Sequence, residues 1–414
     1  MQDDSNPRPK GEPQPRLLVL TSTYPRWAGD PEPGFVHELS KRLTDKFQVT
    51  VLCPHAPGAL PKQVMDGVEV IRYRYAPAFL ERLVNNGGIV TNLKRHPWML
   101  LLLPSFILGQ LFWLYKLGHR RNTDVIHAHW LIPQGFLVAF LMAFGRKMAP
   151  FVVTSHGADL FALRGKLLTK IKQFTLARSA SATVVSHAMK TMIAEMGVPP
   201  DKIAVQSMGI DLQHRFYPDT NIQRNPNELL FVGRLVEKKG LGYLIEALPH
   251  ILQQRPNVRL TIAGFGPELS IRQQQVKDLN LSSHVDFIGA VPQSELPSLY
   301  RRAAVFVAPF IQAASGDQEG LGLVVLEALG CGCPAVISDL PATREFGDIH
   351  GLRRTPPANA QILAQTLLDQ LQNPVTPDRA ALMRFDWQYR ADCYSDILLD
   401  TAKKNGFNGM EISL

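Results

Sequence analysis

Cysteine is scarce in this 414-residue sequence, which contains only Cys53, Cys331, Cys333 and Cys393. Cys331 and Cys333 are separated by one residue, and this spacing fits neither a zinc knuckle nor a redox-active CxxC pair. Buried free thiols in a reducing compartment are the simplest interpretation, so we expect a cytoplasmic protein. Residues 1–15 are polar and proline-rich and lack the apolar core of a secretion signal, which predicts a disordered tail.

Charged residues are absent from Pro97 to Tyr115, and this run is nearly long enough to span a bilayer. Pro104 and Gln110 interrupt the run, and it leads directly into a predicted strand at Asp124–His129. A membrane-spanning helix would place the two parts of one sheet on opposite sides of the membrane. Basic residues flank the run on both sides. We therefore predict an ordinary domain helix, or one that rests on a membrane surface.

Positive charge is unevenly distributed along the sequence. Residues 1–210 contain 25 Lys and Arg against 14 Asp and Glu, whereas residues 211–414 contain 19 against 22. The basic first half indicates an anionic partner, such as a phosphate-bearing lipid or a membrane surface, or else a merely soluble basic face. The charge distribution alone does not distinguish these two interpretations. A nucleic-acid partner is disfavoured, because the charge accompanies membrane-type apolar residues and no base-stacking motif is present.

Short apolar runs alternate with segments of helical spacing, a pattern typical of a mostly parallel, doubly wound sheet. In the first half the predicted strands are Arg16–Thr21, Gln48–Pro54, Val68–Tyr73, Asp124–His129, Phe151–Ser155, Ala182–Ser186 and Ile203–Ser207. The pattern restarts after a polar segment at Gln213–Asn227, a predicted linker. There the predicted strands are Glu228–Leu235, Val258–Ala263, Val285–Gly289, Val305–Pro309 and Ala335–Asp339. Together with the chain length, this predicts two Rossmann-like α/β domains, residues 16–211 and 212–384.

A polar loop with two glycines follows one of these predicted strands and leads into a helix predicted to begin at Leu321. Gly320 and Gly322 allow close approach of the backbone to a ligand, and a helix amino terminus offers free N–H groups to phosphate. Glu319 precedes the helix. Glu327 lies two turns along it, where a carboxylate can accept hydrogen bonds from the paired hydroxyls of a ribose. Taken alone, both glutamates could equally be solvated carboxylates.

Two cations lie at the end of the predicted strand Glu228–Leu235 and just beyond it. Arg234 and Lys239 suit a diphosphate that gains negative charge as its bond to a sugar breaks, and ligands of open α/β sheets bind at such strand ends. Glu237 and Lys238 are predicted to be solvated loop charges. No DxD motif follows an apolar strand, so no metal site is predicted.

His127 and His129, in the segment IHAHW, form a second pair at a predicted strand end. They could indicate a metal, but no carboxylate accompanies them. The structural interpretation is therefore favoured.

The sequence resembles the family-four retaining glycosyltransferases (glycosyl transferases group 1) from about residue 16 to residue 400. The resemblance is carried by GRLVEKKG at 233–240, AGFGPE at 263–268, FIGAV at 287–291 and EGLGLVVLEALGCGCPAV at 319–336. In that family two glutamates separated by seven residues mark the donor site, as Glu319 and Glu327 are here. The resemblance implies the GT-B fold, in which two Rossmann-like domains face a cleft and a last helix, here at about 385–402, crosses back to the first domain.

The resemblance also implies a role for each site residue. Glu319 would contact the hydroxyls of the transferred sugar, Glu327 the ribose, and Arg234 and Lys239 the diphosphate. His156, in the segment TSHGADL, would lie near the sugar and the β-phosphate. The implied catalytic residues are therefore Glu319, Lys239, Arg234 and His156. Further donor contacts are implied for Gly34, Gly264, Gly266, Gly289, Ala290, Val291, Gly320, Leu321, Gly322 and Leu323.

The first turn departs from the family pattern, because Pro33-Gly34 stands where many relatives carry a paired glycine. Close approach of the backbone to a ligand at this turn would depend on Gly34 alone.

The implied function is retaining hexosyl transfer, without metal or other cofactor, from a nucleotide-diphosphate sugar to a lipid-linked or polysaccharide-precursor acceptor. The basic first half and its apolar run would suit a peripheral enzyme at the inner face of the cytoplasmic membrane. A nucleotide-sugar epimerase on the same fold is one alternative. A non-catalytic partner subunit that binds sugar nucleotides is another, although the presence of Arg234, Lys239, Glu319 and Glu327 argues against it.

Overall fold

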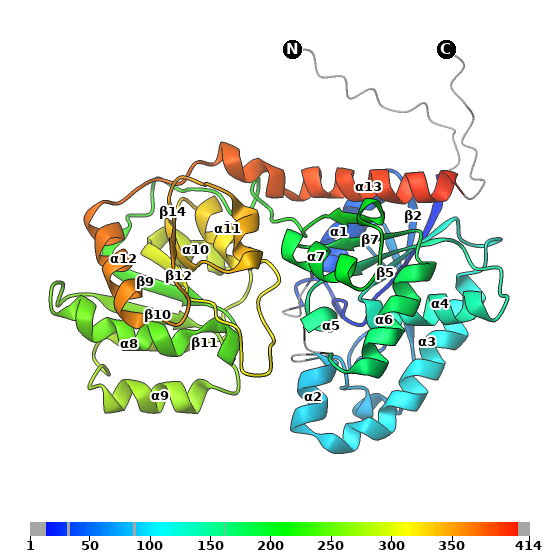
Figure 1. The fold of residues 1–414 in the computed structure, drawn as a ribbon, viewed down its shortest axis with the longest axis horizontal. Coiled ribbons are helices and arrows are strands. Elements are labelled where there is room, and N and C mark those ends of the chain that lie inside the picture. The colour runs from blue at the N-terminus through cyan, green and yellow to red at the C-terminus, as the bar shows by residue number, and fades with distance from the viewer. Residues whose placement is uncertain (1–13, 31–33, 86–87, 162, 405–414) are drawn as a thin grey trace, which may run out of the picture.

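The computed structural model describes residues 14–30, 34–85, 88–161 and 163–404. The predicted disordered tail, residues 1–15, lies outside the described residues except for its last two positions. Figure 1 shows two α/β domains side by side, with the last helix lying along the first domain at the top of the view. The predicted α/β class with two doubly wound domains is confirmed.

The described part of the first domain contains an eight-stranded sheet with the order β3-β4-β2-β1-β5-β6-β7-β8. All neighbours are parallel except β3 and β4. Its strands are β1 (Arg16–Leu20), β2 (Gln48–Pro54), β3 (Lys62–Met65), β4 (Val68–Tyr73), β5 (Val125–His129), β6 (Phe151–Ser155), β7 (Ser181–Val184) and β8 (Ile203–Val205). Its helices are α1 (Phe35–Leu43), α2 (Ile89–Arg95), α3 (Leu103–Leu117), α4 (Phe136–Ala143), α5 (Ala158–Phe161), α6 (Lys166–Arg178) and α7 (His187–Glu195).

The second domain contains a six-stranded, fully parallel sheet with the order β11-β10-β9-β12-β13-β14 within the described residues. Its strands are β9 (Asn225–Val232), β10 (Arg259–Ala263), β11 (Val285–Gly289), β12 (Ala303–Ala308), β13 (Ala335–Ser338) and β14 (Leu352–Thr355). The helices from here to the end are α8 (Leu241–Leu252), α9 (Leu269–Asp278), α10 (Leu296–Arg302), α11 (Leu323–Gly330), α12 (Ala360–Gln372) and α13 (Trp387–Lys403).

Each sheet has a point where the direction of winding reverses. In the second domain the chain runs outward from β9 through β10 to β11 and then returns to place β12 beside β9. In the first domain it runs outward from β1 through β2 to β4 and returns to place β5 beside β1. Ligands of open α/β sheets bind outside the carboxyl ends of the strands at such a point. The loops after β9 and β12 are therefore the expected ligand-binding region of the second domain.

The last helix, α13, covers the segment predicted to cross back to the first domain. Ile210 and the start of α13 exchange two backbone hydrogen bonds, from Ile210 N to Phe385 O (2.9 Å) and from Trp387 N to Ile210 O (3.0 Å). A Cβ atom at Gly209 would lie 2.6 Å from the Trp387 Cα, so only glycine allows this close crossing. Farther along α13 the buried Tyr394 donates its hydroxyl to the Gln206 carbonyl at 2.8 Å.

The four cysteines are free thiols, as the sequence predicts. Burial is complete for Cys53, Cys331 and Cys333, whereas Cys393 is only half-buried. The prediction of buried thiols is therefore wrong for Cys393, which lies in α13 on the outside of the first domain.

Candidate functional site

The loop after β9 turns sharply at Gly240, which precedes α8. Gly240 has a φ of 67°, and a Cβ atom there would lie 1.8 Å from the Pro309 carbonyl oxygen at the end of β12. Only glycine lets these two loops, at the reversal point of the sheet, approach so closely. This contact places Lys239 beside the loop that follows β12.

Lys239 forms an ion pair with Glu319, with Nζ 2.6 Å from Oε2. The Lys239 ammonium also lies 4.8 Å from the centre of the Phe310 ring. Burial opposes ionisation of the Glu319 carboxyl, but Lys239, Lys238 and the Gly320 N–H outweigh it and lower its pKa to about 2. Glu319 is therefore a carboxylate at every physiological pH, and it pairs with Lys239 at the carboxyl end of the sheet.

The neighbouring charges Lys238 and Glu237 hold the loop after β12 in place. Lys238 Nζ lies 3.2 Å from the Asp317 carboxylate, and the Glu237 carboxylate accepts a hydrogen bond from Ala314 N at 2.8 Å. Glu237 is exposed, as the prediction of a solvated loop charge requires, whereas Lys238 is half-buried, and both also have a partner in the loop after β12. Residues about 80 positions apart meet here because β9 and β12 are adjacent in the sheet.

The helix after this loop, α11, begins at Leu323, two residues later than predicted. Gly322 precedes it with a φ of 91°, and a Cβ atom there would lie 2.8 Å from the Phe310 ring. No side chain caps the first turn of α11. Its N–H groups and the positive end of its dipole are therefore available to an anion such as phosphate. Leu321, just before the turn, is buried.

Glu327 lies in α11 and is buried, with 8% of its surface exposed. Burial raises the pKa of its carboxyl to about 7, although the Tyr300 hydroxyl, which donates to Oε2 at 2.9 Å, and the charges of Arg215 and Lys239 favour the ionised form. The two predicted donor-site glutamates thus have opposite electrostatic environments. Lys239 acts on the pKa of both carboxyls.

His156 follows β6 in the first domain and lies against the loop after β12 in the second domain (residues 309–322), the predicted donor loop. A Cβ atom at Gly320 would lie 3.0 Å from the His156 carbonyl oxygen. The His156 ring stacks on the His129 ring, with Nε2 2.9 Å from Nδ1 of His129. Burial lowers the pKa of His156 to about 3, with a further contribution from His127. The imidazole is therefore neutral and can offer a hydrogen bond but not a positive charge.

Arg234, after β9, reaches across to the first domain. Its Nη2 lies 3.5 Å from Oγ1 of Thr91 in α2. Burial lowers the pKa of Arg234, and the nearby Arg95 lowers it further, while Asp317 raises it. A second cross-domain hydrogen bond runs from Arg164 Nη2 to the Gly316 carbonyl at 3.0 Å. Both contacts join the site loops of the second domain to the first domain.

Gly264 and Gly266 pack the loop after β10 against the loop after β9. A Cβ atom at Gly264 would lie 1.8 Å from the Gly233 carbonyl oxygen, and one at Gly266 would lie 2.3 Å from the Leu235 carbonyl oxygen. Their lack of a side chain is thus explained by loop packing. Gly289, at the end of β11, has a φ of 74° and accepts a hydrogen bond from Gly264 N at 2.7 Å.

The remaining predicted donor contacts lie at the margins of these loops. Ala290 is exposed and Val291 is half-buried, and both follow Gly289. Gly34 precedes α1 with a φ of −90°, and the nearest atom to a Cβ placed there is Pro25 Cγ at 3.7 Å. Glycine is therefore not required at position 34 by local geometry. Pro33, which precedes Gly34 in the turn that differs from the family pattern, lies outside the described residues.

The strand-end histidines His127 and His129 are both buried in the first domain. His127 Nε2 lies 2.7 Å from the Thr154 hydroxyl, and the rings of His127 and His129 lie 4.2 Å apart. Burial lowers the pKa of His127 to about 3. Among the residues that the structure describes, no group of three or more His, Cys, Asp or Glu side chains could hold a metal ion.

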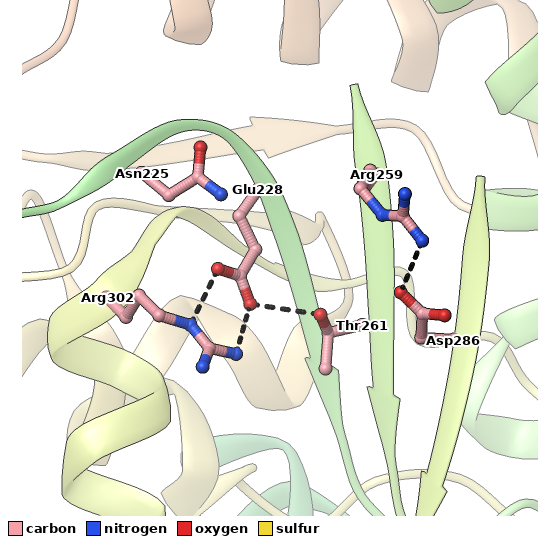
Figure 2. A pocket seen from close by; sticks show the side chains of 6 residues that line it. All are labelled: Asn225, Glu228, Arg259, Thr261, Asp286 and Arg302. Atoms are coloured by element: carbon pink, nitrogen blue, oxygen red, sulfur yellow. Dashed lines mark hydrogen bonds and ion pairs between the residues drawn. The ribbon is translucent and has the colours of Figure 1, made fainter. Parts of the chain in front are cut away.

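Figure 2 shows a charged cavity of about 300 Å³ at the opposite end of the second sheet, near the start of β9, β10 and β11. Glu228 accepts hydrogen bonds from Arg302, at 2.7 and 2.8 Å, and from the Thr261 hydroxyl at 2.9 Å. Arg259 and Asp286 form a second pair at 3.1 Å. Because these charges pair with one another, the described lining residues of this cavity offer a ligand no unpaired charge.

Two family models divide the chain between them. The model described as Glycosyltransferase Family 4 matches residues 35–214, and the model described as Glycosyl transferases group 1 matches residues 214–382. The chain belongs to the group 1 glycosyltransferases. The boundary between the two matches coincides with the polar segment that joins the two domains.

This group 1 glycosyltransferase is similar to several bacterial glycosyltransferases and to solved structures. It is 28% identical over 346 residues to a GDP-mannose-dependent alpha-(1-6)-phosphatidylinositol monomannoside mannosyltransferase of Mycolicibacterium smegmatis, covering 77% of this chain and 79% of the relative. It is 31% identical over 252 residues to a putative colanic acid biosynthesis glycosyltransferase of Salmonella typhimurium, covering 60% and 61%. The solved sucrose-phosphate synthase of Thermosynechococcus elongatus superposes with a TM-score of 0.68 at 18% identity, over 95% of this chain and 98% of that one. The fold is GT-B.

In this group 1 glycosyltransferase the predicted residues converge from two domains. Lys239 touches Glu319, influences the pKa of Glu327, and lies beside the loop that meets His156. Sequence reasoning missed Tyr300, Arg164 and Thr91, which the fold alone brings to this region. It predicted Lys238 only as a solvated loop charge, although this ammonium also lowers the pKa of Glu319.

Proposed function

We propose that this glycosyltransferase moves a hexose, with retention of configuration and without a metal ion, from a nucleotide-diphosphate sugar to a lipid-linked or polysaccharide-precursor acceptor. The observation that carries the proposal is the Lys239–Glu319 pair at the open start of α11, where β9 and β12 meet. The names of the relatives support the classes of donor and acceptor, since one is a GDP-mannose-dependent phosphatidylinositol monomannoside mannosyltransferase and another a putative colanic acid biosynthesis glycosyltransferase.

The donor diphosphate would occupy the space between Lys239, Arg234 and the first turn of α11. Negative charge develops on the diphosphate as its bond to the sugar breaks, and preorganised donors in a site of low dielectric stabilise that charge. In the structure the Glu319 carboxylate is paired with the Lys239 ammonium. A bound diphosphate would take over Lys239 and leave the Glu319 carboxylate to accept hydrogen bonds from the sugar hydroxyls. The neutral His156 would donate a hydrogen bond to the same sugar or to its β-phosphate.

For a retaining transfer, the acceptor hydroxyl would enter on the face from which the diphosphate leaves. The departing phosphate oxygen would accept the proton of that hydroxyl, so no side chain has to act as general base. Burial lowers the pKa of His156 to about 3, so its imidazole is too weak a base to compete with the departing phosphate for the proton.

The deciding experiment is a transfer assay with nucleotide sugars and a membrane-lipid extract as acceptor, run in the presence of a metal chelator. We expect release of nucleoside diphosphate only when acceptor is present, and a product whose anomeric configuration, measured by NMR, matches that of the donor. A new sugar nucleotide formed without acceptor would identify an epimerase. Donor binding without any product would identify a non-catalytic subunit.

We expect donor binding to release protons near neutral pH. The Glu327 carboxyl has a pKa of about 7, whereas hydrogen bonds from ribose hydroxyls stabilise its ionised form. By linkage, donor affinity falls as the pH drops below about 7. Calorimetry in buffers of different ionisation enthalpy measures the released protons. Glu327→Gln, which cannot ionise, should bind more weakly and without proton release; unchanged proton release in that variant would remove this role.

We also propose that the first domain rests on an anionic membrane surface through the helical segment Pro97–Leu117. This is the one helix in the described parts of the chain that is long and apolar enough to cross a membrane. One side of it packs on the sheet through Phe106 and Leu114, while Leu101 and Leu108 on the other side are 82% and 63% exposed. Trp98, Leu100, Phe112 and Tyr115 are also exposed.

Basic residues border this exposed apolar surface. Lys94 and Arg95 end α2 just before it, and Lys116 lies 5.3 Å from the centre of the Phe112 ring. Arg146 lies 4.8 Å from the centre of the Tyr115 ring. Apolar side chains bordered by cations are complementary to lipid chains and anionic headgroups. Such a surface would hold the active site near a lipid-linked acceptor at the inner face of the cytoplasmic membrane.

Binding to phosphatidylglycerol vesicles should weaken about tenfold or more in a Leu101→Glu/Phe112→Glu double variant, since two large apolar contacts are lost. Co-sedimentation at low salt measures this. Ile271→Glu is the matched control, because Ile271 is an exposed apolar residue in α9 of the second domain. Equal sedimentation of the double variant and the wild-type protein would refute membrane contact through this segment.

A further inference from the structure

A second cavity, of about 430 Å³, lies between the two domains beside the crossing segment. Its walls come from α7 and the end of β8 in the first domain, from the donor loop at Leu321, and from the start of α13. Lys190, Arg384 and Arg390 place three cations around it, and Glu345 is its one carboxylate among the described residues.

The Glu345 carboxylate is already engaged by the start of α7. It accepts hydrogen bonds from the His187 backbone N–H and from His187 Nδ1, the latter at 2.9 Å. The Glu345 carboxylate forms no ion pair with the described Lys190, Arg384 or Arg390. Within the ranges that the structure describes, Lys190, Arg384 and Arg390 form no ion pair with a carboxylate. The cavity thus carries unbalanced positive charge.

Two buried polar groups in this cavity also have no partner among the described residues. The Ser207 side chain is 3% exposed, and its hydroxyl makes no hydrogen bond. Arg390 donates from Nη1 to Gln206 Oε1 at 3.0 Å, but its buried Nε donates to nothing. Buried polar groups in folded proteins are nearly always paired with protein, water or an ion. A hydroxyl and a guanidinium N–H beside two further cations match the acceptor oxygens of an anion.

The cavity shares a wall with the donor loop. A Cβ atom at Gly320 would lie 3.3 Å from Val185 Cγ2, and both Val185 and Leu321 line the cavity. Whatever fills it therefore contacts both domains next to the loop that carries Glu319. An occupant that favours this arrangement of the domains would also favour the arrangement of the donor loop.

We propose that this cavity binds a phosphoryl-bearing anion, separate from the donor site, through Lys190, Ser207, Arg384 and Arg390. A phosphoryl group brings several acceptor oxygens and up to two negative charges, which suits three cations and a hydroxyl. The cavity of Figure 2 differs in this respect, because each arginine that lines it already forms an ion pair with a carboxylate. Both a free phosphate ester and a phospholipid headgroup carry such a phosphoryl group. The proposal does not depend on the transfer reaction.

The first test uses inorganic phosphate as the probe and thermal unfolding as the readout, in a Lys239→Met background that weakens phosphate binding at the donor site. Stabilisation by a ligand increases with its concentration relative to the dissociation constant, so titrations yield affinities. We expect Lys190→Ala to weaken phosphate binding about tenfold, as the loss of one charge-assisted contact does. Lys277→Ala is the matched control, since Lys277 is an exposed cation in α9. It should bind phosphate unchanged.

Ser207→Ala adds a readout that a merely structural role would not produce. Because the Ser207 hydroxyl has no partner within the described chain, its removal should leave the melting temperature without phosphate unchanged or higher. The same variant should weaken phosphate binding several-fold. A lower melting temperature without phosphate, together with unchanged phosphate affinity, would overturn the assignment.

The second arm distinguishes the sources of the phosphoryl group. Stabilisation by phosphate or glycerol phosphate that depends on Lys190 and Ser207 would assign a soluble ligand. If only co-sedimentation with phosphatidylglycerol vesicles depends on Lys190 and Ser207, and co-sedimentation with phosphatidylcholine vesicles does not, the ligand is a phospholipid headgroup. If Lys190→Ala, Ser207→Ala and Lys277→Ala behave alike with every probe, the cavity binds no phosphoryl anion and the proposal fails.

Discussion

Replacing Lys239 with alanine is expected to lower the turnover of sugar transfer by roughly 100-fold or more, the usual cost of losing one donor to a developing oxyanion. Its ammonium is held 2.6 Å from the Glu319 carboxylate and close enough to Glu327 to influence that pKa as well. Removing it leaves the half-buried Glu319 without its main counter-charge and the diphosphate without one of its two cations. Initial rates at saturating donor measure the loss.

Lys238→Ala is the matched control for this experiment. Lys238 is the neighbouring residue with the same charge, but it is engaged by Asp317 at 3.2 Å and by the Gln318 carbonyl at 3.3 Å. Its removal should loosen the donor loop and raise KM more than it lowers kcat. Near-normal turnover in Lys239→Ala would contradict the mechanism. Equal losses of turnover in both variants would mean that the assay reports on how well the loop after β12 is held in place, and not on the position of the Lys239 ammonium.

The second large effect is expected on the stability of the fold, in the variant Gly240→Ala. A methyl group there would lie 1.8 Å from the Pro309 carbonyl oxygen, and the residue would also keep a φ of 67°. Backbone has to move, because the obstacle is a carbonyl at the end of a buried strand and not a flexible side chain. We expect a loss of about 3 kcal/mol or more in the free energy of unfolding. Urea unfolding followed by circular dichroism measures it.

Gly145→Ala separates the clash from the backbone strain. Gly145 has a similar φ of 74°, but no atom lies within 4 Å of a Cβ placed there. It should therefore lose only about 1–2 kcal/mol, the cost of a left-handed conformation in a residue with a side chain. If the two variants unfold at the same urea concentration, the contact between the β9 and β12 loops does not constrain the fold as described.

Sequence patterns located most of the strands because the central strands are buried on both faces. The predicted bounds of β2, β4, β6 and β11 match the structure. The missed strands are β3 and β14, which lie at the sheet edges. β3 reads KQVM with no fully buried residue, and β14 reads LRRT with one, so neither shows the apolar run of a central strand.

The order and chemistry of the site residues were determined by the sequence itself. The spacing of Glu319 and Glu327 and the cations Arg234 and Lys239 at a strand end all belong to short segments. Local segments of this kind adopt loops and helix starts that neighbouring residues largely specify. The two-domain α/β class follows from the same local patterns.

Only the tertiary structure decided which of these groups meet and in what protonation state. Lys239 and Glu319 are 80 residues apart, and Arg164 and Gly316 are 152 apart. Their contacts depend on strand order and on the closure of two domains, which no local pattern encodes. Two glutamates of one motif differ by several pKa units because one faces Lys239 and the other is buried against Tyr300. Burial and neighbouring charge set a pKa, and both are properties of the folded chain.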